Sequence, residues 1–129
     1  MSQQSVPSVY LLALLHDIQQ ALDRLITTGE PTVIDLVNCP LAAGDLEQLR
    51  TWLGQGEVTA TVTALGPTYI HETRYSGVWW LDYHNDNEER IGQQLEITDI
   101  PQLLRPQHED LTDARAAFGA ALAAVPTDL

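Results

Sequence analysis

The chain has 129 residues, 18 acidic and six basic side chains, a formal net charge of −12 and a single cysteine, Cys39. This length suits one domain with a core large enough to fold without disulfides or metal ions. The charge argues against nucleic acid or an anionic membrane as a partner, because both require a cationic surface. One cysteine excludes an internal disulfide and any all-cysteine metal site within the chain.

The first predicted element is a long amphipathic helix. Apolar residues recur at helical spacing from Leu11 to Leu25, which predicts a helix over residues 8–28. Ser8 can cap its start and Gly29 suits its end. Residues 32–37 are short, apolar and β-rich, which is typical of a strand buried on both faces. Residues 46–53 then predict a second helix.

The middle of the chain predicts strands. Residues 57–64 alternate, and we expect Val58, Ala60 and Val62 to face the core beneath the first helix, with the intervening threonines facing away. The other predicted strands cover residues 68–75, 78–84 and 90–97, with a hairpin tip at residues 85–88.

The last predicted element is an alanine-rich helix over residues 111–124 whose inner stripe contains Ala114, Phe118, Ala121 and Leu122. The complete order predicts an α+β fold: a mixed, mainly antiparallel sheet of about five strands, with helices packed mostly on one face. The helix between the first two strands is compatible with a parallel pair. We expect a single domain over residues 1–129, with a core of about 8–125.

No catalytic or metal-binding motif stands out. Carboxylates border turns or strand ends, but no spacing selects a catalytic pair, so no catalytic residue is predicted. The four histidines are dispersed without metal-ligand spacing, so neither a metal nor another cofactor is expected. We interpret Cys39 as a buried, inert thiol and His84 as solvated. The carboxylates are Glu30, Asp35, Glu57 and Glu72, and the other histidines are His16, His71 and His108.

Two adjacent tryptophans provide the best candidate for a binding surface. Trp79 and Trp80 must point to opposite faces of a regular strand. We expect one to enter the core with Val62 and Leu95, and the other to lie among polar neighbours on the open face. Two alternatives follow for this outer tryptophan. In one, residues 101–129 cover it. In the other, it anchors a partner or a second copy of the chain.

Several short segments in fixed order resemble one family. The resemblance is to the C-terminal domain of HupH/HyaF/HoxQ-type hydrogenase expression proteins, which are accessory factors for maturing nickel–iron hydrogenases. The segments are Ala21-Leu22-x-Arg24-Leu25, Thr28-Gly29-Glu30-Pro31, Ile34-Asp35-Leu36, Gly54-x-Gly56-Glu57-Val58 and Gly77-Val78-Trp79-Trp80.

The resemblance implies a non-enzymatic, cytoplasmic binding module for a hydrogenase subunit precursor, the iron–sulfur small subunit first, or for a fellow accessory protein. We take Trp79, Trp80, Glu57 and Glu72 as candidate partner-binding residues. Two alternatives stay open: a small hydrolase or transferase using strand-end carboxylates, and a homodimeric scaffold. The sequence has no apolar run long enough for a membrane span, and residues 1–5 have no basic region typical of a secretory signal.

Overall fold

The computed structural model describes residues 6–127. The prediction that residues 1–5 do not form a secretory signal concerns residues outside this range. Three α-helices, five strands and one 3₁₀ helix follow one another within this range. They are α1 (Val9–Thr28), β1 (Thr32–Asp35), α2 (Asp45–Leu53), β2 (Thr59–Thr63), β3 (Pro67–Glu72), β4 (Val78–His84), β5 (Arg90–Ile97), η1 (Gln102–Leu104) and α3 (His108–Ala123).

The five strands form one open sheet in the order β1-β5-β4-β3-β2. Strands β2 to β5 form an antiparallel meander, and β1 pairs antiparallel with β5 so that Thr32 lies opposite Ile97. The α+β, five-stranded prediction is confirmed. The parallel pair does not form, because β1 joins the last strand and β2 occupies the other edge of the sheet.

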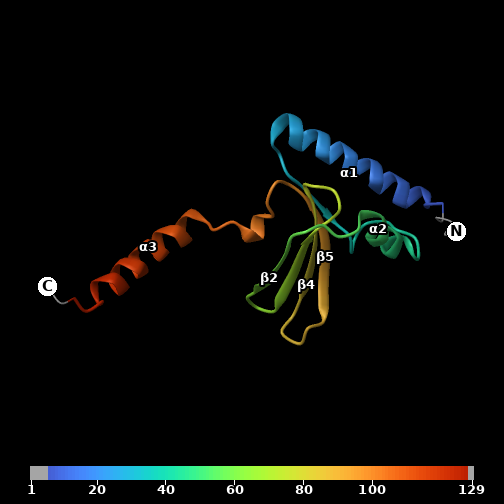
Figure 1. The fold of residues 1–129 in the computed structure, drawn as a ribbon. Helices are drawn as coiled ribbons and strands as arrows, with labels where there is room; N and C mark the ends of the chain where they lie inside the picture. The colour runs from blue at the N-terminus through green and yellow to red at the C-terminus, as the bar shows by residue number, and fades with distance from the viewer. Residues whose placement is uncertain (1–5, 128–129) are drawn as a thin grey trace.

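Helices α1 and α2 pack on one face of the sheet (Figure 1). The Ser8 side chain caps α1 by accepting a hydrogen bond from the Leu11 amide, and Gly29 ends the helix in the left-handed conformation. The stripe therefore predicts the helix correctly, but its expected packing against residues 57–64 is wrong. The reason is that β2 lies at an edge, while the central strands place Trp80 and Leu95 under the helices.

The opposite face carries a second, smaller apolar cluster. Ile70, Trp79 and Leu81 form it, and Ala60 and Val62 pack against it. The apolar and polar residues of β2 thus alternate between the two faces as predicted. The apolar residues, however, face away from α1 and α2. The two tryptophans take opposite faces as predicted. Because Val62 and Leu95 also lie on opposite faces, the expected packing of one tryptophan with both is wrong.

Helix α3 projects away from the sheet (Figure 1). Gln107 and Asp110 form a capping box at its start, yet none of its residues is buried. Phe118, predicted on an inner stripe, is 73% exposed. The predicted inward packing of this helix is therefore wrong.

Candidate functional site

Three of the four candidate partner-binding residues meet at one end of the sheet. Glu72 lies directly opposite Trp79 in the pairing of β3 and β4. The Gly56 amide donates to the Glu72 carbonyl over 2.7 Å, and the Glu72 amide donates to the Val58 carbonyl over 2.9 Å. These two bonds hold exposed Glu57 alongside Glu72. Trp80 stands apart, because it points to the helix-covered face.

Trp79 is the outer tryptophan, and it is covered. In the cross-strand register Trp79 pairs with Glu72 on one side and Glu96 on the other, and its Nε1 donates to the carbonyl oxygen of Thr98 over 3.2 Å. Leu104 of η1 packs against the same cluster. Only 6% of Trp79 is exposed, so contact between its ring and a partner requires the segment after β5 to move.

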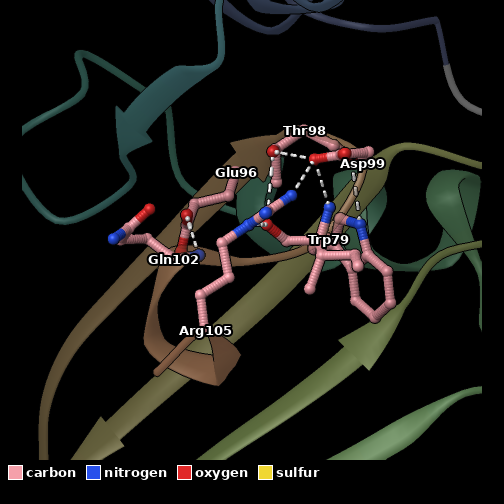
Figure 2. Close-up of polar contacts among 7 residues, drawn as sticks. Trp79, Glu96, Thr98, Asp99, Gln102 and Arg105 are labelled. Atoms are coloured by element: carbon pink, nitrogen blue, oxygen red, sulfur yellow. Dashed lines mark hydrogen bonds and ion pairs between the residues drawn. The ribbon is translucent and has the colours of Figure 1, made fainter. Parts of the chain in front are cut away.

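Polar contacts hold that covering segment in place. Figure 2 shows Arg105 reaching back to Asp99. The distance between Arg105 Nη2 and Asp99 Oδ1 is 2.7 Å, and Arg105 Nε donates to the carbonyl oxygen of Ile100 over 3.3 Å. The Gln102 amide donates to Glu96 Oε1 over 3.3 Å. Hydrogen bonding to Arg105, and then to the Ile100 amide, lowers the pKa of Asp99. The sequence did not predict this clamp, because it depends on a turn that brings Arg105 back.

A second polar cluster surrounds Trp80 on the helix-covered face. The Arg50 guanidinium lies 4.5 Å from the ring centroid of Trp80, a cation–π geometry. Asp82 accepts a 2.6 Å hydrogen bond from Gln93 and forms ion pairs with Arg50 and Arg90 at 3.4 and 3.3 Å. The carboxylate is buried and satisfied by three partners, an arrangement that fixes α2 against the sheet.

The histidines do not assemble into a metal site. His71 stacks on Trp80 with 6.3 Å between ring centroids, and burial, together with the charge of Arg50, lowers its pKa. His84 differs from the expected solvated side chain, because its Nδ1 is buried without a hydrogen-bond partner. Across residues 6–127, no three histidine, cysteine or acidic side chains are grouped so that they could hold a metal ion.

The remaining strand-end groups have structural surroundings. Asp35 accepts hydrogen bonds from the Val37 amide and the Asn38 side chain, which closes the turn after β1, and Asn38 is the main cause of its lowered pKa. Cys39 is partly buried, and burial raises the pKa of its thiol, which disfavours the reactive thiolate.

Two hollows stand out on the surface of the described residues. One, of about 640 Å³, is polar and lies between β2 and the β4–β5 hairpin tip, where Asp86 and Glu88 line it. The other, of about 290 Å³, is an apolar groove between α1 and the stacked rings of Trp52 and Tyr75. None of the four strand-end carboxylates lines either hollow. No helix within the described part of the chain has the length and apolar character needed to cross a membrane.

Comparison with known proteins assigns the family. The sequence model of the HupH hydrogenase expression protein, C-terminal conserved region, matches residues 11–125. The chain belongs to this family. The match runs from α1 through α3, so it includes both the sheet end around Trp79 and the projecting helix.

Curated relatives extend the comparison. The chain is 40% identical over 94 residues to hydrogenase expression/formation protein HoxQ of Azotobacter vinelandii, covering 73% of this chain and 32% of the relative. It is 42% identical over 94 residues to HupQ of Azotobacter chroococcum mcd 1, with the same coverage. The chain thus spans about a third of the length of these relatives.

A solved structure has the same fold. The hydrogenase expression protein HupH from Thiobacillus denitrificans ATCC 25259 is 38% identical and superposes with a TM-score of 0.86. The alignment covers 93% of this chain and all of that chain. This agreement independently supports the antiparallel α+β architecture described above.

Proposed function

We propose that this chain is an accessory factor in nickel–iron hydrogenase maturation. In this role it binds a hydrogenase subunit precursor, the iron–sulfur small subunit first, or a fellow accessory protein, without catalysing a reaction. The observation that carries the proposal is the family match over residues 11–125, supported by relatives named hydrogenase expression/formation proteins. We place this activity in the cytoplasm, where a subunit precursor is made and folds.

The surface chemistry supports binding rather than catalysis. None of the four strand-end carboxylates lines either hollow described above, and Asp35 is engaged in a turn. The net charge of −12 favours a client segment that is positively charged, because opposite charges accelerate encounter and orient the partners.

We propose the sheet end around Glu57 and Glu72 as the contact surface for the client. Glu57 is exposed and Glu72 is half-buried beside it, so both carboxylates can meet a basic partner. Trp79 and Trp80 are buried, so in this arrangement they contribute by anchoring the first residues of β4, where Trp79 lies opposite Glu72. Their effect on binding is therefore indirect.

The test is affinity capture of the tagged chain from a cell that produces hydrogenase, with quantitative mass spectrometry of the retained proteins. We expect enrichment of a hydrogenase subunit precursor or an accessory protein. The double variant Glu57→Lys/Glu72→Lys should lose this enrichment. The matched control Glu89→Lys/Glu109→Lys changes two exposed acids elsewhere and should retain it.

Two results would contradict the proposal. If the folded, unmodified chain enriches no hydrogenase-related protein, the assignment as a maturation factor fails. If the chain enriches such a protein and both double variants retain it equally, the maturation role stands and the contact surface lies elsewhere.

A further inference from the structure

A row of side chains crosses the face of the sheet that α1 and α2 leave open. Trp79 of β4 lies directly opposite Glu72 of β3 and Glu96 of β5, and Glu96 lies opposite Val33 of β1. Residues that are directly opposite in neighbouring strands share one face and are neighbours. The row therefore places one large aromatic ring between two carboxylates, with Val33, which is 57% exposed, at its end.

Glu96 is a buried carboxylate with little compensation for its burial. The residue is 5% exposed. Its oxygens accept from the Gln94 side chain over 3.4 Å and from the Gln102 amide over 3.3 Å, and both distances are longer than is usual for such bonds. Among residues 6–127, no ion pair joins Glu96 to a basic side chain. A carboxylate in these surroundings is stabilised by an approaching cation or amide donor.

The segment that covers the row is weakly held. We call residues 102–105, which comprise η1 and Arg105, the strap. None of the residues of η1 is buried, and a 3₁₀ helix of this length has poor hydrogen-bond geometry. The ion pair that holds the end of the strap is exposed, with 43% of the Arg105 side chain and 72% of the Asp99 side chain accessible, so it contributes little to stability. Segments of this kind open locally without unfolding the rest of a domain.

The strap also indicates which kind of segment fits the row. Leu104 packs against the apolar cluster that contains Trp79, and the next residue, Arg105, pairs with Asp99. Figure 2 shows Arg105 and Gln102 directed towards acidic side chains on the same side of the sheet as Trp79. A large apolar residue followed directly by a basic residue is therefore complementary to this face. The net charge of −12 favours the approach of such a segment from another protein.

We propose that the strap is autoinhibitory and that a client segment of the same chemistry, a large apolar residue followed by lysine or arginine, displaces it and binds the row. This inference rests on the proposed function, because Glu72 belongs both to the row and to the proposed client surface. While the strap is closed, Trp79 supports that surface indirectly. When the strap moves, the ring of Trp79 contacts the apolar side chain of the client, as a buried aromatic anchor. Glu96 then accepts from the client as it does from Gln102.

The test measures binding of a fluorescent peptide that copies residues 100–107 to the full chain by fluorescence anisotropy. In the strap-released variant Leu104→Ser/Arg105→Ser the row is uncovered, so the peptide should bind at least tenfold more tightly than to the unmodified chain. The matched control Leu122→Ser/Arg115→Ser makes the same two changes at exposed positions of α3 and should bind like the unmodified chain. A peptide with serine in place of the leucine and the arginine at positions 104 and 105 should bind the strap-released variant at least tenfold more weakly.

Acrylamide quenching of tryptophan fluorescence locates the change. The chain has three tryptophans, so a Trp52→Phe background leaves Trp79 and Trp80, which are both buried. Releasing the strap should increase quenching, because Trp79 becomes accessible while Trp80 stays beneath the helices, and bound peptide should reverse the increase. If circular dichroism shows that the double variant does not fold, Arg105→Ser alone is compared with Arg115→Ser, and smaller changes in the same direction are expected.

Equal affinity of the peptide for the strap-released and unmodified chains would overturn the proposal, and so would unchanged quenching. Affinity capture from a hydrogenase-producing cell separates this result from the proposed function. The strap-released variant should enrich more of a hydrogenase subunit precursor or accessory protein than the unmodified chain, and equal enrichment would show that the strap does not restrain the client. If neither chain enriches such a protein, the maturation role fails, whereas peptide binding and quenching still decide whether the strap covers a binding surface.

Discussion

Trp79 and Thr98 are joined across the end of the sheet by a hydrogen bond in which the indole Nε1 donates to the Thr98 carbonyl oxygen over 3.2 Å. The bond connects the start of β4 to the residue directly after β5. It satisfies a buried donor and fixes the point where the chain turns over the Trp79 face. The sheet end that we propose as the client surface is therefore built on this contact.

Replacing Trp79 with phenylalanine should destabilise the domain. The variant loses the indole donor and leaves the buried Thr98 carbonyl oxygen without it, a cost of about 1–3 kcal/mol in the free energy of unfolding. Urea denaturation measures the loss. The control Trp52→Phe changes a ring that is 44% exposed and should cost less than about 0.5 kcal/mol. Equal losses in both variants would contradict the structural role of the Trp79 bond.

Ile18→Asp should unfold the domain or destabilise it severely. Ile18 lies in the main core under α1, and burying a carboxylate there removes about 1.5–3 kcal/mol of apolar burial and adds a desolvation cost. Ile26→Asp makes the same change on the same helix at an 80% exposed position and should leave the melting temperature nearly unchanged. Similar thermal melts for the two variants would show that α1 does not pack as described.

Asp82→Asn should cost about 1–3 kcal/mol of stability. It removes the charge that pairs with Arg50 and Arg90, and it leaves the Arg50 guanidinium over Trp80 without a counter-ion. Asp99→Asn breaks an exposed pair with Arg105, for which about 0–1 kcal/mol is expected. Denaturant titration of both variants at neutral pH measures the two losses. Asp82→Asn should lose more stability than Asp99→Asn, and the reverse order would contradict this account.

Stability should fall as the pH is lowered through the ordinary histidine range, in part because of His71. Its folded-state pKa lies below the usual 6.5, so the unfolded state binds a proton first as the pH falls. The contribution of His71 to the free energy of unfolding is fully present above pH 6.5. It is lost as the pH falls from 6.5 through the lower folded-state pKa. Denaturation curves at several pH values should show a weaker pH dependence for His71→Gln. The control His108→Gln, exposed on α3, should follow the unmodified chain.

The purified chain should carry no stoichiometric transition metal. Its histidines are dispersed, its one cysteine is partly buried, and the described residues contain no group of three suitable ligands. Elemental analysis of protein purified without chelators measures this directly. About one bound transition metal per chain would contradict the prediction.

The sequence predicted the elements better than their packing. The leucine stripe and the residues at its two ends gave α1, and strict alternation placed Trp79 and Trp80 on opposite faces. Neither pattern reveals which face a helix covers, because both faces of β4 are apolar. Strand order decides that question, and it depends on the distant pairing of β1 with β5.

The sequence did not predict that η1 covers Trp79 or that α3 is exposed, and the reasons differ. The Asp99–Arg105 pair depends on a local turn that has no periodic signal in the sequence. Helix α3 is rich in alanine, so its stripe indicates a helix but carries little information about what the helix packs against. The pattern predicts core positions for its apolar residues, but each of them is exposed.

Hydrogenase maturation in the native host, with and without this chain, tests the central claim most directly. Cells that lack the chain should accumulate immature hydrogenase small subunit, visible by immunoblotting, and should lose hydrogen-dependent dye reduction. Expressing the chain again should reverse both effects, whereas the Glu57→Lys/Glu72→Lys variant should not. Normal processing and undiminished hydrogenase activity in the absence of the chain would contradict the proposed role.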